Sequence, residues 1–147
     1  VVIGDRGTDS YALHDHKAFL FDKEKELLVL PVQLAEIPEE LKTQQTEQWP
    51  KQGDFVFQGA FVYNLSLENG FELKGRISHV EGDDSFKKAG YYYYNSLESV
   101  KRSLFIDNVL YTISDGKLFA NSLSDLSLIK QVKLGEKPEN TYPPLIE

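Results

Sequence analysis

Residues 101–134 have the sequence KRSLFIDNVLYTISDGKLFANSLSDLSLIKQVKL. The stretch contains four short apolar or alternating runs, separated by the pairs Asp-Asn, Asp-Gly and Ser-Asp. Alternation with a period of two is typical of β-strands, and these polar pairs are typical of tight turns. Two-residue turns make neighbouring strands antiparallel. We therefore predict that this stretch forms a four-stranded antiparallel meander.

The first half of the chain repeats this order. Runs at 16–21, 26–34, 59–67 and 71–80 predict four further strands, and Glu68-Asn69-Gly70 joins the last two. An Asn-Gly pair between two alternating runs is the strongest short-range hairpin signal, because both residues tolerate positive φ. The sequence thus predicts an all-β protein with two four-stranded antiparallel meander units.

The second unit is close to the length of one β-propeller blade. On this basis we assign residues 1–10 to the end of a preceding blade and a connection, 11–80 to a blade with an insertion at 35–54, 81–99 to the connection between blades, 100–134 to a second blade, and 135–147 to an extended tail. The insertion is predicted to contain a short helix that starts at Pro38, because proline suits a first helical turn.

Composition excludes several classes of protein. The 147 residues suffice for one domain with a core, and the formal net charge of −7 argues against nucleic acid as a partner. No apolar run is long enough for a membrane-spanning segment. The absence of cysteine excludes disulfides and thiolate chemistry. Methionine is also absent, even at position 1, so we expect the chain to be a fragment of a longer protein.

Three stretches carry a family resemblance: DRGTDSYALHDHKAFLFDKEKELLVLPV (5–32), GRISHV (75–80) and VKRSLFIDNVLYTISDGKLFANSLSDLSLI (100–129). They resemble secreted archaeal and bacterial proteins with a C-terminal β-propeller domain, a family distantly related to WD40 repeats. The likeness extends from about residue 4 to residue 134. It implies a propeller fold and an extracellular or cell-surface location, but no defined activity.

The resemblance implies that two units are not a whole propeller. A closed ring has about four to eight blades, and each blade covers the apolar face of its neighbour. The chain is therefore predicted to be a two-blade fragment of a larger ring. The remaining blades would come from the parent chain or from another chain. An alternative is that the eight strands close on themselves as a small barrel or sandwich around a ligand.

Propeller topology also predicts where a site would lie. It places the stretch 5–15, the insertion and the inter-blade connection on one rim, together with the end of the fourth strand. The candidate metal ligands on this rim are Asp5, Asp9, His14, Asp15, His16 and His79. Histidines at i and i+2 share one side of an extended chain and suit a transition metal such as zinc. The aspartates suit calcium. Alternatively, these residues make turn hydrogen bonds and pack at the channel mouth.

Catalytic sequence motifs are not found. The chain has no G-x-S-x-G elbow, no P-loop and no H-E-x-x-H. The function we predict is that of a secreted or cell-surface binding or structural scaffold, and an enzyme is not favoured. The alternative is a metal-dependent hydrolase with its site at the mouth of the propeller channel.

Overall fold

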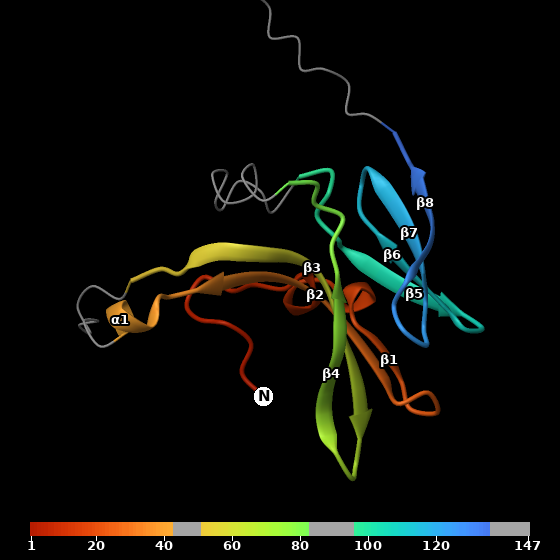
Figure 1. Cartoon of the computed structure of the whole chain (residues 1–147), viewed down its shortest axis with the longest axis horizontal. Helices are drawn as coiled ribbons and strands as arrows, with labels where there is room; N and C mark the ends of the chain where they lie inside the picture. The colour runs from red at the N-terminus through yellow and green to blue at the C-terminus, as the bar shows by residue number, and fades with distance from the viewer. Residues whose placement is uncertain (43–50, 83–95, 136–147) are drawn as a thin grey trace, which may run out of the picture.

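The computed structural model describes residues 1–42, 51–82 and 96–135. They form two four-stranded antiparallel sheets with meander order (Figure 1). Sheet 1 contains β1 (Leu20–Asp22), β2 (Leu27–Glu36), β3 (Asp54–Ser66) and β4 (Gly70–Ile77). Sheet 2 contains β5 (Arg102–Ile106), β6 (Val109–Ile113), β7 (Lys117–Ser122) and β8 (Leu128–Lys133). The predicted fold class is therefore confirmed.

The hairpins form where turn residues predict them. Ser66 pairs with Gly70 across a three-residue loop, and Gly70 has a φ of +68°. Glycine in this left-handed position after a three-residue loop is a common hairpin geometry. In sheet 2, Ile106 pairs with Val109 across a two-residue turn, and Asp107 has a φ of +52°. The turn residues thus set the register of the β3–β4 hairpin in sheet 1 and of the β5–β6 hairpin in sheet 2.

The strand predicted over residues 16–21 is wrong for its first half. Two 3₁₀ helices, η1 (Tyr11–Leu13) and η2 (His16–Ala18), precede β1. The Ser10 hydroxyl accepts a hydrogen bond from the Ala12 amide, and the Asp15 carboxylate accepts one from the Lys17 amide. Such side-chain bonds to the nearby backbone compete with strand pairing. The extended chain therefore begins only at Leu20.

The hairpin of β2 and β3 is longer than predicted. Pairing runs from Leu27 opposite Asn64 to Glu36 opposite Asp54, with a bulge after Leu34. The predicted insertion at 35–54 therefore shrinks to the loop between these strands. Helix α1 (Glu39–Lys42) follows Pro38, as predicted.

Several predicted segments lie partly or wholly outside the described residues, namely the rest of the insertion (43–50), much of the inter-blade connection (83–95) and most of the tail (136–147). None of the helices in the described ranges is long and apolar enough to cross a membrane.

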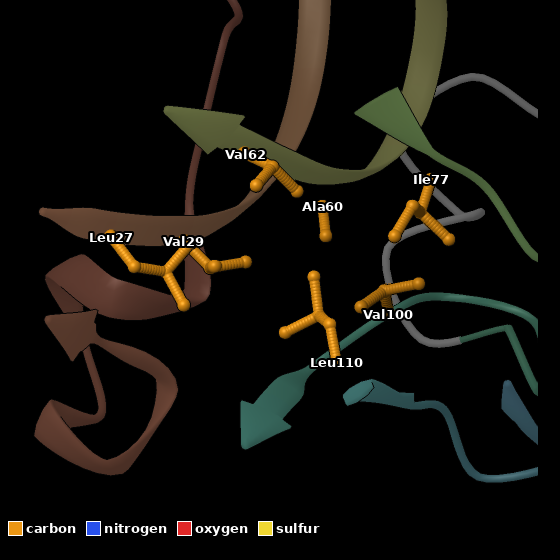
Figure 2. Packing of buried hydrophobic residues seen from close by; sticks show 7 residues of the cluster. All are labelled: Leu27, Val29, Ala60, Val62, Ile77, Val100 and Leu110. Carbon is orange, nitrogen blue, oxygen red and sulfur yellow. The ribbon is translucent and has the colours of Figure 1, made fainter. Parts of the chain in front are cut away.

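The main core lies between the two sheets. Figure 2 shows its side chains pointing toward one another from both sheets. Sheet 1 contributes Leu27, Val29, Ala60, Val62 and Ile77, and sheet 2 contributes Leu110, with Val100 just before β5. All seven are 5% exposed or less. The two sheets therefore share one hydrophobic core, which we call the inter-sheet core.

We call the face of each sheet that points away from the other sheet its outer face. On sheet 1 this face carries a second cluster, Leu28, Val32, Leu34, Phe61 and Tyr63, against which Ile3 packs. The N-terminal segment also runs along the free edge of β2, where Asp9 bridges to Gln33. On sheet 2 the outer face exposes Leu104 and Val132. Both outer faces thus carry apolar side chains, and among the residues that the structure describes, the N-terminal segment covers part of that of sheet 1.

Candidate functional site

A buried histidine joins the two sheets beside the inter-sheet core. His79 follows β4 and is 1% exposed. Its Nδ1 lies 2.9 Å from the Ser114 hydroxyl and its Nε2 lies 2.8 Å from the Thr112 hydroxyl. The ring also packs on Phe119, with 4.0 Å between ring centroids. Both nitrogens of this side chain of sheet 1 are therefore hydrogen-bonded to sheet 2.

The imidazole of His79 is neutral at physiological pH. Burial, which disfavours the charged form, and the nearby positive charge of Lys117 lower its pKa to about 4, against the opposing influence of Glu98. A neutral imidazole donates through one nitrogen and accepts through the other. This matches two hydroxyl partners, since a hydroxyl can do either.

Lys117 is the first residue of β7. Its side chain links β7 to the end of sheet 1 and to the segment that connects the two sheets. Its side chain is only 12% exposed. The ammonium lies 2.7 Å from a carboxylate oxygen of Glu81 and 2.7 Å from one of Glu98, and it donates to the His79 carbonyl at 3.0 Å. Burial alone would lower the pKa of Lys117, but the two carboxylates raise it above its ordinary value. The ammonium is therefore charged and fully paired.

Gln58 forms the third contact. Its side-chain amide donates to the Val100 carbonyl at 3.1 Å and accepts from the Val100 amide at 3.0 Å. Gln58 is 2% exposed, so both bonds are shielded from water. We call this set the seam: Gln58, His79, Thr112, Ser114 and Lys117, with their partners Glu81, Glu98 and Val100. Its polar groups bind one another, which suits a structural junction more than a reactive site.

The predicted metal ligands lie in separate places. Asp9 and His14 do come together, with 3.5 Å between the carboxylate and Nε2. Asp5 instead accepts from the Ile37 amide at 2.8 Å and pairs with Lys42 at 3.3 Å. The Ile37 N–H and then the Lys42 charge hold the pKa of Asp5 below its ordinary value. The opening segment thus lies against the loop after β2, as topology predicted.

The remaining candidates point elsewhere. Asp15 accepts from the Lys17 amide and pairs with Arg102 at 2.9 Å, and these two groups lower its pKa. His16 is exposed in η2. Two premises of the prediction are wrong. His14 has a helical backbone and His16 begins a 3₁₀ helix, so the two histidines do not lie on one extended strand, and His79 turns into the seam instead of the rim. Within residues 1–42, 51–82 and 96–135 no three His, Asp or Glu side chains gather as metal ligands. Metal binding, whether of calcium or a transition metal, stays a prediction.

Two successive four-stranded meanders that share a core face to face are the arrangement of neighbouring propeller blades. A family model described as "Beta propeller domain" matches residues 1–126. The chain belongs to this propeller family. Sheets 1 and 2 are two of its blades, and the seam is a contact between propeller blades. Comparison with curated proteins and with solved structures found no match.

Sequence reasoning missed most of the propeller seam. Of its residues, only His79 was singled out, and for a different role. A usable signal was present in the strand over 109–114, where Thr112 and Ser114 share one side with Leu110. Polar side chains on the face that packs against a core need hydrogen-bond partners. A histidine at the end of the preceding blade can supply them.

Proposed function

We propose that this chain is a two-blade part of a propeller that serves as a binding or structural scaffold outside the cell or at its surface. Further blades, from the same parent chain or from another chain, would cover the outer faces of sheets 1 and 2. The location rests only on the resemblance to secreted archaeal and bacterial proteins with a C-terminal propeller distantly related to WD40 repeats.

One observation carries the proposal: the side chains on the two faces of sheet 2 differ in their exposure to solvent. On the face toward sheet 1, Leu110 is 0% exposed. On the outer face, Leu104 is 41% exposed and Ile106 is 58% exposed. Removing apolar surface from water contributes roughly 25 cal/mol per Å². A further blade packed on the outer face would gain this stabilisation in the way that sheet 1 already does.

A metal-dependent hydrolase has no comparable support. The seam residues bind one another, and Asp9 with His14 supplies two of the three or more ligands that a catalytic metal requires. We therefore propose the scaffold alone.

The proposal is tested by thiol protection, since the chain has no cysteine of its own. Leu104→Cys places a thiol on the outer face of sheet 2, and Leu67→Cys places a control thiol at the fully exposed β3–β4 turn. Both variants are made in the 147-residue chain and in the longest translated product that contains it. We expect both thiols to react readily in the chain alone, and the Leu104→Cys thiol to react at least tenfold more slowly in the longer product.

Equal reactivity of the two thiols in the longer product would contradict the proposal. If translation yields no longer product, the blades must come from other chains. The Leu104→Cys thiol must then be protected in the complexes isolated from the source cells. A free monomer with a reactive thiol at this position would again contradict the scaffold.

A further inference from the structure

The outer face of sheet 1 can be compared directly with the His79 contact on sheet 2. The two sheets can be aligned on their first hairpins. Leu27 is the first residue of β2 after the β1–β2 turn, and Val109 is the first residue of β6 after the β5–β6 turn. Counting onward, the equivalent positions are Leu30 for Thr112, Val32 for Ser114, and Phe61 for Phe119. The ring that stacks on His79 thus has an aromatic counterpart, but the two hydroxyls have aliphatic ones.

An apolar groove lies at these aliphatic positions. Its volume is about 330 Å³, and its walls include Ile3, Leu13, Phe19, Leu30 and Val32. Leu13 is 75% exposed and Phe19 is 52% exposed, so the groove has uncovered apolar walls. The polar residues that also line it, Thr8, Asp9 and Ser10, already bond to the Ala35 backbone, the Ser10 amide and the Pro31 carbonyl. An imidazole that replaces Ile3 would find no counterpart of the two hydroxyls that bind His79, which is unfavourable. The groove therefore suits an aliphatic side chain.

Ile3 already lies in this groove, and the chain around it resembles the chain after His79. Gly4 directly follows Ile3 with a φ of +67°, and Gly82 follows His79 three residues later with a φ of +84°. Both stretches are later bonded to the second strand of the next sheet or to the residues just after it. Asp9 forms a β-bridge with Gln33 of β2. In sheet 2 the Leu97 carbonyl accepts from the Gly116 amide, three residues after β6, at 2.7 Å.

We infer that Ile3 is the counterpart of His79 on sheet 1, and that Val1–Ile3 is the exit of the outermost strand of a further blade. This blade would cover the groove with aliphatic side chains. The inference rests on the proposed function and adds the chemistry of the neighbour. The two blade contacts are consequently not interchangeable, since one is built for histidine and the other for an aliphatic side chain.

The first experiment introduces the residue types of the His79 contact at the Ile3 contact, within the 147-residue chain. Ile3→His is made alone and in the background Leu30→Thr/Val32→Ser, which supplies the two hydroxyls of the other contact. Urea unfolding measures the equilibrium constant of each variant. We expect Ile3→His to raise the unfolding constant about tenfold in the natural background, because the imidazole is left without partners. In the hydroxyl background it should raise the constant less than twofold.

Ile3→Val is the matched control, because it stays aliphatic and should be tolerated in the natural background. If Ile3→His gives no folded protein, the same cycle is run with Ile3→Thr, which has the shape of valine and a hydroxyl in place of a methyl group. The same penalty in both backgrounds, or no penalty in either, would overturn the assignment of Ile3.

The second experiment asks what covers the groove. A Leu13→Cys thiol is compared between the chain alone and the longest translated product, with Leu67→Cys as control. Protection of Leu13→Cys only in the longer product supports a further blade on this face. Protection in the chain alone that grows with concentration would identify a second copy as occupant and overturn the inference.

If Leu104→Cys is protected but Ile3 shows no coupling, the scaffold stands and the inference fails. If Ile3 couples but neither thiol is ever protected, the further blade and the scaffold both fail.

Discussion

Sheet 1 has two faces with opposite surroundings. The face toward sheet 2 buries aliphatic side chains, and Gln58 and His79 hydrogen-bond across the junction. The outer face is covered only in part, by the N-terminal segment, and keeps an apolar groove beside Leu30. One meander thus presents a completed contact and an uncompleted one. The difference indicates that the isolated chain is stabilised mainly by the inter-sheet core and the seam, and less by its outer faces.

The largest expected effect comes from the inter-sheet core. Leu110→Ala removes a side chain that is 0% exposed and should lower the free energy of unfolding by about 3 kcal/mol. Leu104→Ala, on the outer face of the same sheet, should cost less than about 1 kcal/mol in the isolated chain, because water already reaches this side chain. Urea denaturation of both variants gives the two values. Equal losses would show that the two faces are not different.

A smaller effect is expected at the seam. His79→Leu keeps most of the volume but removes the partner of the Thr112 hydroxyl and one of the three bonds of the Ser114 hydroxyl, which still bonds to the Lys117 backbone. Orphaned buried polar groups should lower the free energy of unfolding by about 2 kcal/mol. His14→Leu is the control, since the His14 side chain is 64% exposed and its loss should change stability by less than about 0.5 kcal/mol. A control loss as large as that of His79→Leu would place the two histidines in similar surroundings.

The pH dependence of stability sharpens the same contrast. The folded-state pKa of His79, about 4, lies below the value of 6.5 for a free imidazole. The unfolded chain therefore binds the proton more tightly, so stability is full above about pH 6.5 and falls as pH falls toward 4. Between pH 7 and pH 5 the expected loss is roughly 2 kcal/mol. The pKa values of Asp5 and Asp15 are lowered from 3.8, so their contributions are lost only below this window.

Urea denaturation at several pH values measures this slope. His79→Leu should abolish the loss between pH 7 and pH 5, whereas His14→Leu should leave it unchanged. A loss that persists in His79→Leu would mean that another group carries the proton.

The smallest effect is expected where a contact is exposed. Arg102 pairs with Asp15 at 2.9 Å, but both side chains are reached by solvent, at 51% and 38% exposure. Arg102→Gln should therefore lower the free energy of unfolding by about 0.5 kcal/mol, and 1 M salt should remove the difference. The measurement is urea denaturation at low and high salt. A loss near that of His79→Leu would mean that this exposed pair contributes as much to the free energy of unfolding as the His79 contact does, contrary to the account.

The sheets could be predicted from local sequence signals. Asn69-Gly70, Asp107-Asn108 and Asp115-Gly116 mark three turns, and alternation between them marks strands. These signals are local because a turn depends on the φ preferences of its own residues. They give the number of strands and their antiparallel order without any knowledge of distant contacts.

The seam and the strand ends could not be predicted in the same way. The first residues of β3, near Phe55, pair with Ala35 across a loop, and this pairing extends a segment that looked like an insertion. His16 falls in a 3₁₀ helix because Asp15 caps it. His79 finds Thr112 and Ser114 more than thirty residues away. The sequence pattern suggested that His79 could be functional, but only the packing of two sheets explains why it is buried.

The most direct test of the account is the NMR titration of the His79 imidazole in the 147-residue chain, assigned with the His79→Leu variant. If the two blades share the seam, the ring is enclosed between sheet 1 and the face of β6 and β7, and it titrates with a pKa of about 4. A pKa near 6.5, the value of an imidazole in water, would mean that the sheets do not hold this ring between them and would contradict the account.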